Sequence, residues 1–188
     1  MHLDMRNQIV IGENGKKGLR DVMGIVLIDP QFDDIPEFYT CFEQTTLVPV
    51  VLANRYYLYD TKNRKTLTKG YDRIFRYFGA YINYFVAVEN GKKSILDASS
   101  GHELTPIIMD EVYEMQDEDG AIPMLSDGKA AFLWGETYTG PIFERALIFS
   151  ECFTEVMYNG EWGWIDCDGK FTKEKSKASF GSWYDLDK

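Results

Sequence analysis

The sequence predicts an all-β fold built from consecutive hairpin repeats, and three observations support this prediction. A short phrase that begins at a turn returns five times along the 188 residues. A second landmark, an acidic residue between apolar residues, keeps the same period. Aromatic residues make up 15% of the chain and occur in every repeat, which suits half-buried strands. Such a period indicates stacked supersecondary units, because a single unit cannot bury its own apolar face.

The phrase is clearest near the end of the chain, where it reads NGEWGWIDCDGK from Asn159. Its turn positions lie 39, 37, 37 and 32 residues apart. They are Gly15, Asn54, Gly91, Gly128 and Gly160. An aspartate closes the phrase in every copy except the fourth, which has a tryptophan. The closing residues are Asp21, Asp60, Asp97, Trp134 and Asp166.

The second landmark, here called the acidic step, reads apolar-acidic-x-apolar and follows the turn by 16 to 19 residues. Its acids are Asp33, Asp72, Asp110 and Glu144. Because the acid recurs at a fixed position, we expect it to accept hydrogen bonds from backbone N–H groups of the next repeat's turn. Adjacent acids on a strand point to opposite faces, which argues against a pair of catalytic carboxylates. The fifth copy lacks the step, as expected for the end of an array.

Each repeat is predicted as three short strands. The first enters the turn, as in 84–89 and 153–158, the second leaves it, as in 56–59 and 162–165, and the third carries the acidic step. Asn-Gly and Asp-Gly pairs favour two-residue type I′ hairpin turns. These pairs begin at Asn14, Asn90, Asp127, Asn159 and Asp168. Helical periodicity is weak, and only 72–80 and 110–118 could hold a turn or two of helix.

The predicted organisation is one domain over residues 1–172, with repeat cores near 14–50, 54–89, 90–126, 127–158 and 159–172. Residues 173–188 form a polar tail or cap, in which Trp183 and Tyr184 could cover the open end of the array. We expect an antiparallel meander coiled into an open spiral or barrel-like array. Propeller-like closure is the alternative, although propeller blades usually have four strands and about 40 or more residues.

The phrase and the acidic step together resemble the WG repeat. The fifth copy matches this pattern through Gly160, Trp162, Gly163, Trp164, Ile165, Asp166 and Gly169, and the first copy through Pro30, Phe32, Asp33, Asp34 and Ile35. Copies two to four are degenerate. The resemblance covers about residues 10 to 172 and implies a β-rich repeat fold, but no general reaction, cofactor or catalytic residue.

Signatures of catalysis and metal binding are scarce. The two histidines, His2 and His102, have no nearby acid or cysteine at ligand spacing, and no phosphate-binding, nucleophile-elbow or zinc motif occurs. Asp166 and Asp168 begin like a calcium loop, but the later ligands do not follow, so a hairpin turn is favoured. We therefore expect no cofactor and no metal.

Three cysteines, an odd number without a C-x-x-C pair, favour free thiols in a reducing compartment. They are Cys41, Cys152 and Cys167, and the last two could form a disulfide in an oxidising compartment. The N-terminal segment lacks the features of a signal peptide, and no apolar run is long enough to span a membrane, which favours a cytoplasmic protein.

Charge indicates the kind of partner. The formal net charge of −10 disfavours nucleic acid and anionic membranes. Residues 110–120 carry six acids and no base. This acidic run is a solvated loop or a docking surface for a basic protein. Its acids are Asp110, Glu111, Glu114, Asp117, Glu118 and Asp119.

Aromatic pairs two residues apart share a strand face, as do Trp162 with Trp164 and Tyr57 with Tyr59. Core packing is favoured for them, with an exposed binding platform as the alternative. Trp134 stands out because it replaces the closing aspartate, and it joins the acidic run as a candidate binding residue.

The sequence thus favours a non-enzymatic repeat module that binds another protein. The most specific version of this hypothesis is an acidic cytoplasmic protein that neutralises a basic partner, as bacterial immunity proteins do with toxins. The alternative is a carboxylate-dependent enzyme or glycan-binding protein whose site is assembled from several repeats. A structural or sensory array without a soluble partner is a third possibility.

Overall fold

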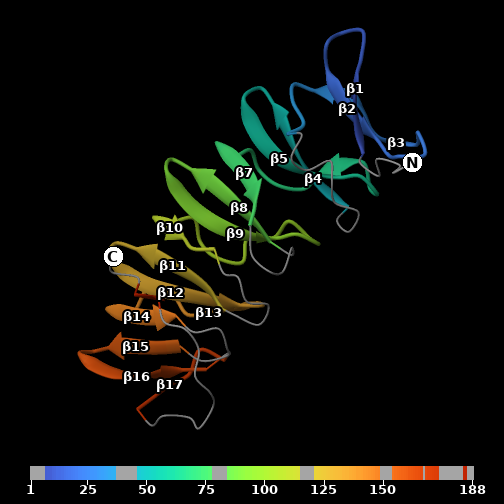
Figure 1. Cartoon of the computed structure of the whole chain (residues 1–188). Helices are drawn as coiled ribbons and strands as arrows, with labels where there is room; N and C mark the ends of the chain where they lie inside the picture. Colours follow the sequence, from blue (N-terminus) through green and yellow to red (C-terminus); the bar gives the residue numbers. More distant parts are fainter. Residues whose placement is uncertain are drawn as a thin grey trace. The chain divides into compact units, whose positions relative to one another are not determined.

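The computed structural model describes residues 7–36, 46–77, 84–114, 121–148, 154–166, 168–173 and 184–185 (Figure 1). These residues form β-strands and no helix, which confirms the predicted all-β class. The described part of the chain accordingly has no helix that could cross a membrane. Its eighteen strands form five small antiparallel sheets, each of them an open meander with two edges.

The strands follow one another through the sheets in chain order, with one late addition. The first sheet holds β1 (Gln8–Ile11), β2 (Lys17–Arg20) and β3 (Val26–Phe32), and the second holds β4 (Leu47–Leu52), β5 (Arg55–Asp60) and β6 (Lys65–Thr66). The third holds β7 (Arg73–Arg76), β8 (Tyr84–Glu89) and β9 (Lys92–Asp97). The fourth holds β10 (Glu111–Val112), β11 (Ile122–Ser126), β12 (Lys129–Trp134) and β13 (Thr137–Tyr138). The fifth holds β14 (Arg145–Ile148), β15 (Thr154–Tyr158), β16 (Glu161–Ile165), β17 (Phe171–Thr172) and, at the far edge of β14, β18 (Tyr184–Asp185).

Contacts divide the chain into two compact units, and each has its own core. The first comprises residues 1–76, 83–90 and 96–103, and the second comprises residues 77–82, 91–95 and 104–188.

Two-residue turns join the central strands of the later sheets. Both turn residues have positive φ, between +50° and +77°, as a type I′ turn requires. These pairs are Ala53-Asn54, Asn90-Gly91, Asp127-Gly128 and Asn159-Gly160. The prediction is therefore confirmed at Asn90, Asp127 and Asn159. The second hairpin reaches the same geometry with Ala53 and Asn54, because asparagine tolerates the left-handed conformation well.

The two other predicted turns have different geometries. In the first hairpin the N–H of Gly12 donates to the C=O of Lys16, so three residues form the turn and only Gly15 of them has positive φ. At Asp168-Gly169 the turn is held by a side chain, since Oδ1 of Asp166 accepts from the N–H groups of Asp168 and Lys170. A local capping acceptor here removes the need for the tight type I′ form.

The acidic step lies where the chain passes from one sheet to the next. The strand that follows it pairs with the next hairpin and therefore belongs to the next sheet, not to the sheet of its own repeat. Tyr71 pairs with Tyr56 on the hairpin before it, whereas Arg73 pairs with Val88 on the hairpin after it. The N–H of Asp72 donates to the C=O of Val88 at 3.0 Å, which draws the chain onto the next sheet. The helical alternatives are wrong where they coincide with β7 and β10, because both segments form ladder hydrogen bonds.

The core of the first unit lies between the first and second sheets. Fully buried apolar side chains from β2, β3 and β4 surround Tyr59, whose ring meets Phe32 edge-on at 5.3 Å. Each such side chain contributes about 1.5–3 kcal/mol relative to exposure. The core comprises Leu19, Ile28, Phe32, Ile35, Val48, Val50 and Tyr59.

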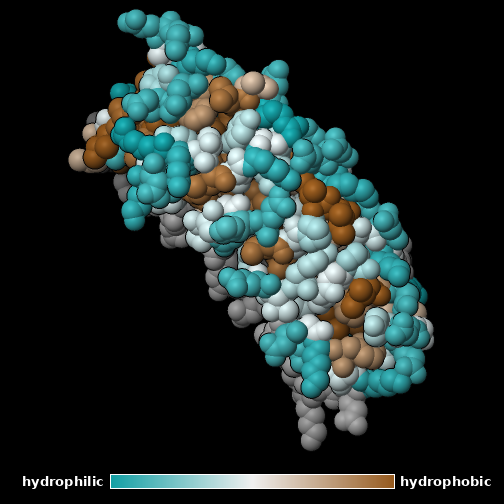
Figure 2. Space-filling view, turned by 180° about the vertical axis from the view of Figure 1, so that it is seen from behind, coloured by the Kyte–Doolittle hydropathy of each residue, from teal (hydrophilic) through white to brown (hydrophobic). Residues whose placement is uncertain are grey.

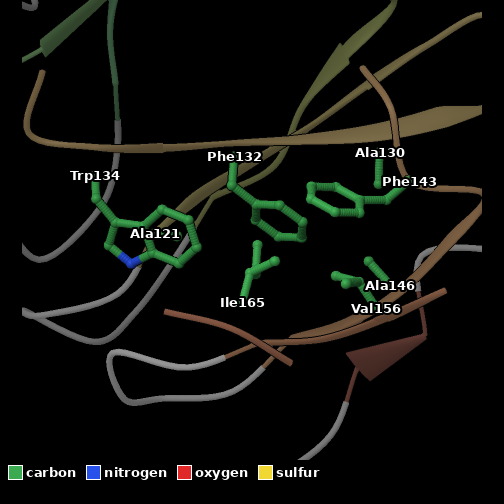
Figure 3. Packing of buried hydrophobic residues seen from close by; sticks show 8 residues of the cluster. All are labelled: Ala121, Ala130, Phe132, Trp134, Phe143, Ala146, Val156 and Ile165. Carbon is green, nitrogen blue, oxygen red and sulfur yellow. The ribbon is translucent and has the colours of Figure 1, made fainter. Parts of the chain in front are cut away.

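The core of the second unit joins the fourth and fifth sheets. Figure 3 shows Phe132, Phe143 and Ile165 pointing toward one another between the strands. The rings of Phe132 and Phe143 lie 6.0 Å apart, and Trp134 stacks on Phe132 at 5.6 Å. Small residues such as Ala130 and Ala146 let the sheets approach these rings. This mixture of large and small side chains fills the space between the sheets.

Candidate binding surface

The acids of the acidic step connect consecutive hairpins through their side chains. Oδ2 of Asp33 accepts from the N–H of Ala53 at 2.6 Å, Oδ2 of Asp72 from Asn90 at 2.7 Å, and Oδ2 of Asp110 from Asp127 at 2.8 Å. In the last copy, Glu144 accepts from Asn159 at 3.1 Å and from Gly160 at 3.4 Å. The predicted structural role of these acids is confirmed, since each one bonds to the turn of the following hairpin.

In the three aspartates among these acids, the second carboxylate oxygen binds a basic residue just after the preceding turn. Oδ1 of Asp33 lies 2.5 Å from Nζ of Lys16, and Oδ1 of Asp110 lies 2.5 Å from Nζ of Lys92. Asp72 makes the equivalent pair with Arg55. Each carboxylate thus joins a side chain of one hairpin to the backbone of the next.

These contacts shift the titration of the groups involved. The hydrogen bond from Lys16, followed by that from the N–H of Ala53, lowers the pKa of Asp33. The hydrogen bond from Lys92, followed by that from the N–H of Asp127, lowers the pKa of Asp110, and the same pair raises the pKa of Lys92. The ionised form of these groups is therefore the one that the fold stabilises.

The acid next to the step binds a different lysine. Nζ of Lys17 donates to Oδ1 of Asp34 at 2.5 Å, and Nζ of Lys93 donates to Oε2 of Glu111. Asp33 and Asp34 therefore have separate partners, as expected of strand neighbours that point to opposite faces. In both Asp33-Asp34 and Asp110-Glu111, the two neighbouring carboxylates thus bind two different lysines.

The structure divides the predicted acidic run into two parts. Asp110 and Glu111 take part in ion pairs with Lys92 and Lys93. Glu114 is exposed. The remaining acids of the run, Asp117, Glu118 and Asp119, lie outside the described residues. Glu114 thus differs from Asp110 and Glu111 in that neither Lys92 nor Lys93 pairs with it.

Trp134 is a core residue rather than a surface platform. Its side chain is 9% exposed and packs against Phe132. Its indole N–H is buried and has no hydrogen-bond partner among the described residues. Its burial in the core of the second unit therefore leaves little of the ring to contact a partner protein.

The role of the closing aspartates in the other repeats explains why the fourth repeat can have Trp134 in their place. In the other repeats the carboxylate caps the turn that follows; for example, Oδ1 of Asp60 accepts from the N–H groups of Lys62 and Asn63. In the fourth repeat a two-residue turn joins β12 to β13, with Trp134 paired to Thr137. Such a tight turn leaves no loop N–H groups for a carboxylate to cap, so the position can hold a core side chain.

The tryptophans of the fifth repeat lie on the outer face of their strand. Trp162 is 39% exposed, and the guanidinium of Arg145 lies 5.9 Å from its ring centre. The buried face of β16 belongs instead to Gly163 and Ile165. Core packing is thus wrong for Trp162, because strand alternation directs it away from the sheet below. The equivalent alternation in β5 buries Tyr59 in the core, as predicted.

A charged network in the first unit has no counterpart in the sequence predictions. Nζ of Lys69 lies 3.2 Å from Oε1 of Glu103 and 3.5 Å from Oε2 of Glu89. Arg55 also reaches Glu89, at 2.9 Å, and the hydroxyl of Tyr71 donates to Glu103 at 2.5 Å. Burial and then the contact with Glu103 raise the pKa of Tyr71. These residues come from separate segments, so no local motif marks them.

In this network Glu89 and Glu103 both contact the ammonium group of Lys69, and Arg55 brings a second positive charge to Glu89. Among the described residues, no group of three histidine, cysteine or acidic side chains could hold a metal ion. His102 lies exposed in the turn after β9, as a solvated loop histidine. His2, Cys41, Cys152 and Cys167 lie outside the described residues.

Exposed apolar side chains form separate patches on a largely hydrophilic surface, as the face drawn in Figure 2 shows. In the first unit they gather on the loop between β2 and β3, where Met23 and Ile25 are exposed beside Val22 and Val26. Ile11 is exposed at the end of β1. Isolated apolar residues of this kind are common on protein surfaces.

No protein-family model and no curated protein matches the sequence. Similar solved structures include Hsv2 of Kluyveromyces lactis, with 12% identity and a TM-score of 0.37 over 90% of this chain and 60% of that chain. The dihydro-heme d1 dehydrogenase NirN in complex with DHE has 10% identity and a TM-score of 0.38 over 97% of this chain and 45% of that chain. The WD40 domain of SCAP from fission yeast has 8% identity and a TM-score of 0.30 over 92% of this chain and 56% of that domain. The chain thus spans 60% or less of the length of each.

Proposed function

We propose that this chain is a non-catalytic protein-binding module of degenerate WG-like repeats, which neutralises a basic partner with acids that its own fold does not use. The chain has 30 acidic and 20 basic residues, which leaves an excess of ten negative charges. An excess of this kind favours fast encounter with a positively charged protein. Small size and acidity are also what an immunity-type protein needs to cover a basic target.

The observation that carries the proposal is the way in which ion pairs divide the acidic run. Lys92 and Lys93, the bases that precede this run in sequence, bind Asp110 and Glu111. Glu114 is exposed. The same polypeptide continues through Asp117, Glu118 and Asp119 without a basic residue. The docking surface is therefore assigned to these four acids, because the first two acids of the run are held in ion pairs with Lys92 and Lys93.

The test compares two variants of equal net charge. The first changes the docking acids, as Glu114→Gln, Asp117→Asn, Glu118→Gln and Asp119→Asn. The control changes four other exposed acids, as Glu13→Gln, Asp127→Asn, Glu136→Gln and Asp168→Asn. Among the described residues, none of these four control side chains accepts a hydrogen bond that joins two hairpins.

Affinity capture from the source cell lysate at low and high salt, followed by mass spectrometry, gives the readout. The proposal expects one stoichiometric basic protein that the wild type and the control retain at low salt and that the first variant loses. High salt weakens the same complex, because exposed charges are screened. Equal retention by both variants would contradict the assignment of the docking surface, and capture of no basic protein would contradict the proposed function.

A further inference from the structure

The incoming strand of each later hairpin has a segment of the preceding repeat bonded to its outer edge. The N–H of the acidic-step residue donates to a carbonyl near the end of that strand at 2.8, 3.0, 2.7 and 2.9 Å. The accepting carbonyls belong to Val51, Val88, Leu125 and Met157. The carboxylate of the same acid then binds an N–H of the turn. This pair of contacts completes the edge of each hairpin.

In the first hairpin, Ile11 occupies the position of these four residues but has no such segment against it. Ile11 pairs with Lys17 as Val51 pairs with Tyr56. The N–H of Gly12 bonds to Lys16, so by alternation the N–H and C=O of Ile11 point away from β2. Within the described ranges, neither these groups nor the N–H of Glu13 has a hydrogen-bond partner.

Side-chain exposure agrees with an open edge at this strand. Ile11 is 69% exposed, whereas Val51 in the equivalent position is 9% exposed. Val51 is less exposed because the segment that contains Asp34 pairs with it and covers it. An uncovered strand edge with an exposed isoleucine is a template for pairing with another extended segment.

The four internal junctions show which sequence suits such an edge, namely an apolar residue followed by an acid. Beyond the fifth phrase the chain has two further pairs of this type, Tyr184-Asp185 and Leu186-Asp187, and the first of them repeats the Tyr71-Asp72 pair. Tyr184 and Asp185 already form a strand, β18, but it pairs with β14 only through Leu147 and Ile148. Because two residue pairs are a small contact, β18 loses little when it leaves β14 for the edge of another strand.

We propose that Tyr184-Asp185 of a second copy docks on the open edge of β1, with the N–H of Asp185 on the carbonyl of Ile11 and its carboxylate on the N–H of Glu13. The acidic side chain of Glu13 does not prevent a carboxylate from binding the N–H of the same residue. Asp110 makes the same contact with the N–H of Asp127, whose own carboxylate is 92% exposed. The two surfaces differ, so the association is head-to-tail and continues from copy to copy until it closes. It is independent of the acidic docking surface described above.

Sedimentation velocity over a wide range of concentrations tests the proposal. The wild type should form species that grow beyond a dimer as concentration rises. Ile11→Pro puts its ring in place of the outward N–H, where the docking strand would lie, without removing a β1–β2 bond, and Asp185→Asn removes the carboxylate charge. Each should weaken the association at least about tenfold, since each removes or weakens edge hydrogen bonds. Glu136→Gln, with the same charge change at an exposed turn residue, serves as the matched control and should leave the association unchanged.

Ile11→Thr separates backbone pairing from apolar contact, because it keeps the N–H and the strand preference. It should retain most of the association, and thermal melts should show a folded protein for every variant. A wild type that stays monomeric at all concentrations would overturn the proposal. So would an association that Ile11→Pro and Asp185→Asn leave unchanged, which would assign it to another surface, such as the apolar loop around Met23.

Discussion

Asp110 and Asp127 are joined across the boundary between two sheets, because the backbone N–H of Asp127 donates to Oδ2 of Asp110 at 2.8 Å. The other oxygen of Asp110 binds Lys92, so one carboxylate links three points of the chain. The same relationship recurs for Asp33 with Ala53 and for Asp72 with Asn90. At these three junctions a single aspartate side chain thus connects consecutive hairpins.

Asp110→Ala should lower the thermal midpoint of unfolding, because it leaves the N–H of Asp127 and the ammonium of Lys92 without their acceptor. Glu111→Ala is the matched control, since Glu111 binds only the side chain of Lys93 at the surface. The control should change the midpoint little, as surface ion pairs usually contribute little. Differential scanning fluorimetry of the two variants decides the point, and equal effects would show that the carboxylate does not join the hairpins.

Stability should fall as the solution is acidified. The folded state lowers the pKa of Asp33 and Asp110 through lysine and backbone hydrogen bonds, and that of Asp60 through Asn63 and neighbouring N–H groups. A lowered pKa contributes stability above the unfolded value of about 3.9 and loses it as pH falls through the folded value.

Equilibrium urea unfolding between about pH 7 and pH 2.5 measures this dependence. The variant Asp33→Asn with Asp110→Asn should show a flatter curve below about pH 4, because two of the linked groups no longer titrate. A variant curve parallel to that of the wild type would contradict the assignment.

Trp134→Asp restores the closing aspartate of the phrase and should still destabilise the protein. It removes a buried ring from the core of the second unit, and losses of this kind cost at least about 3 kcal/mol. Trp162→Asp is the control, since that side chain is 39% exposed, and it should change stability by no more than about 1 kcal/mol. Urea unfolding compares them, and similar free energies of unfolding would contradict the burial of Trp134.

Gly163→Ala should destabilise the fifth sheet. A Cβ at this position would lie 2.5 Å from the ring of Phe171 and 2.6 Å from the carbonyl oxygen of Thr172. Overpacking of this kind costs about 1–3 kcal/mol. Gly160→Asn is the control, because its turn has open space and asparagine tolerates positive φ. Unchanged stability of Gly163→Ala would mean that β17 moves away at little cost.

The repeat period and the turns could be predicted because they depend on local backbone chemistry. Asn90-Gly91, Asp127-Gly128 and Asn159-Gly160 adopt the conformation that these residue types favour. The role of the acidic step was also predictable, since a carboxylate at a fixed period must meet the same neighbour in each repeat. The sequence did not reveal that the closing aspartates cap the turns that follow them, and this capping explains why the fourth repeat can have Trp134 instead.

The sequence by itself therefore determined the all-β class, the number of hairpins and the role of Asp33, Asp72, Asp110 and Glu144, because these follow from residue preferences and periodicity. Only the tertiary structure decided which face of β16 is buried and which sheet β7 joins. It also decided that Lys69, Glu89 and Glu103 meet. These outcomes depend on packing between segments distant in sequence, where burial and hydrogen bonding outweigh local preference.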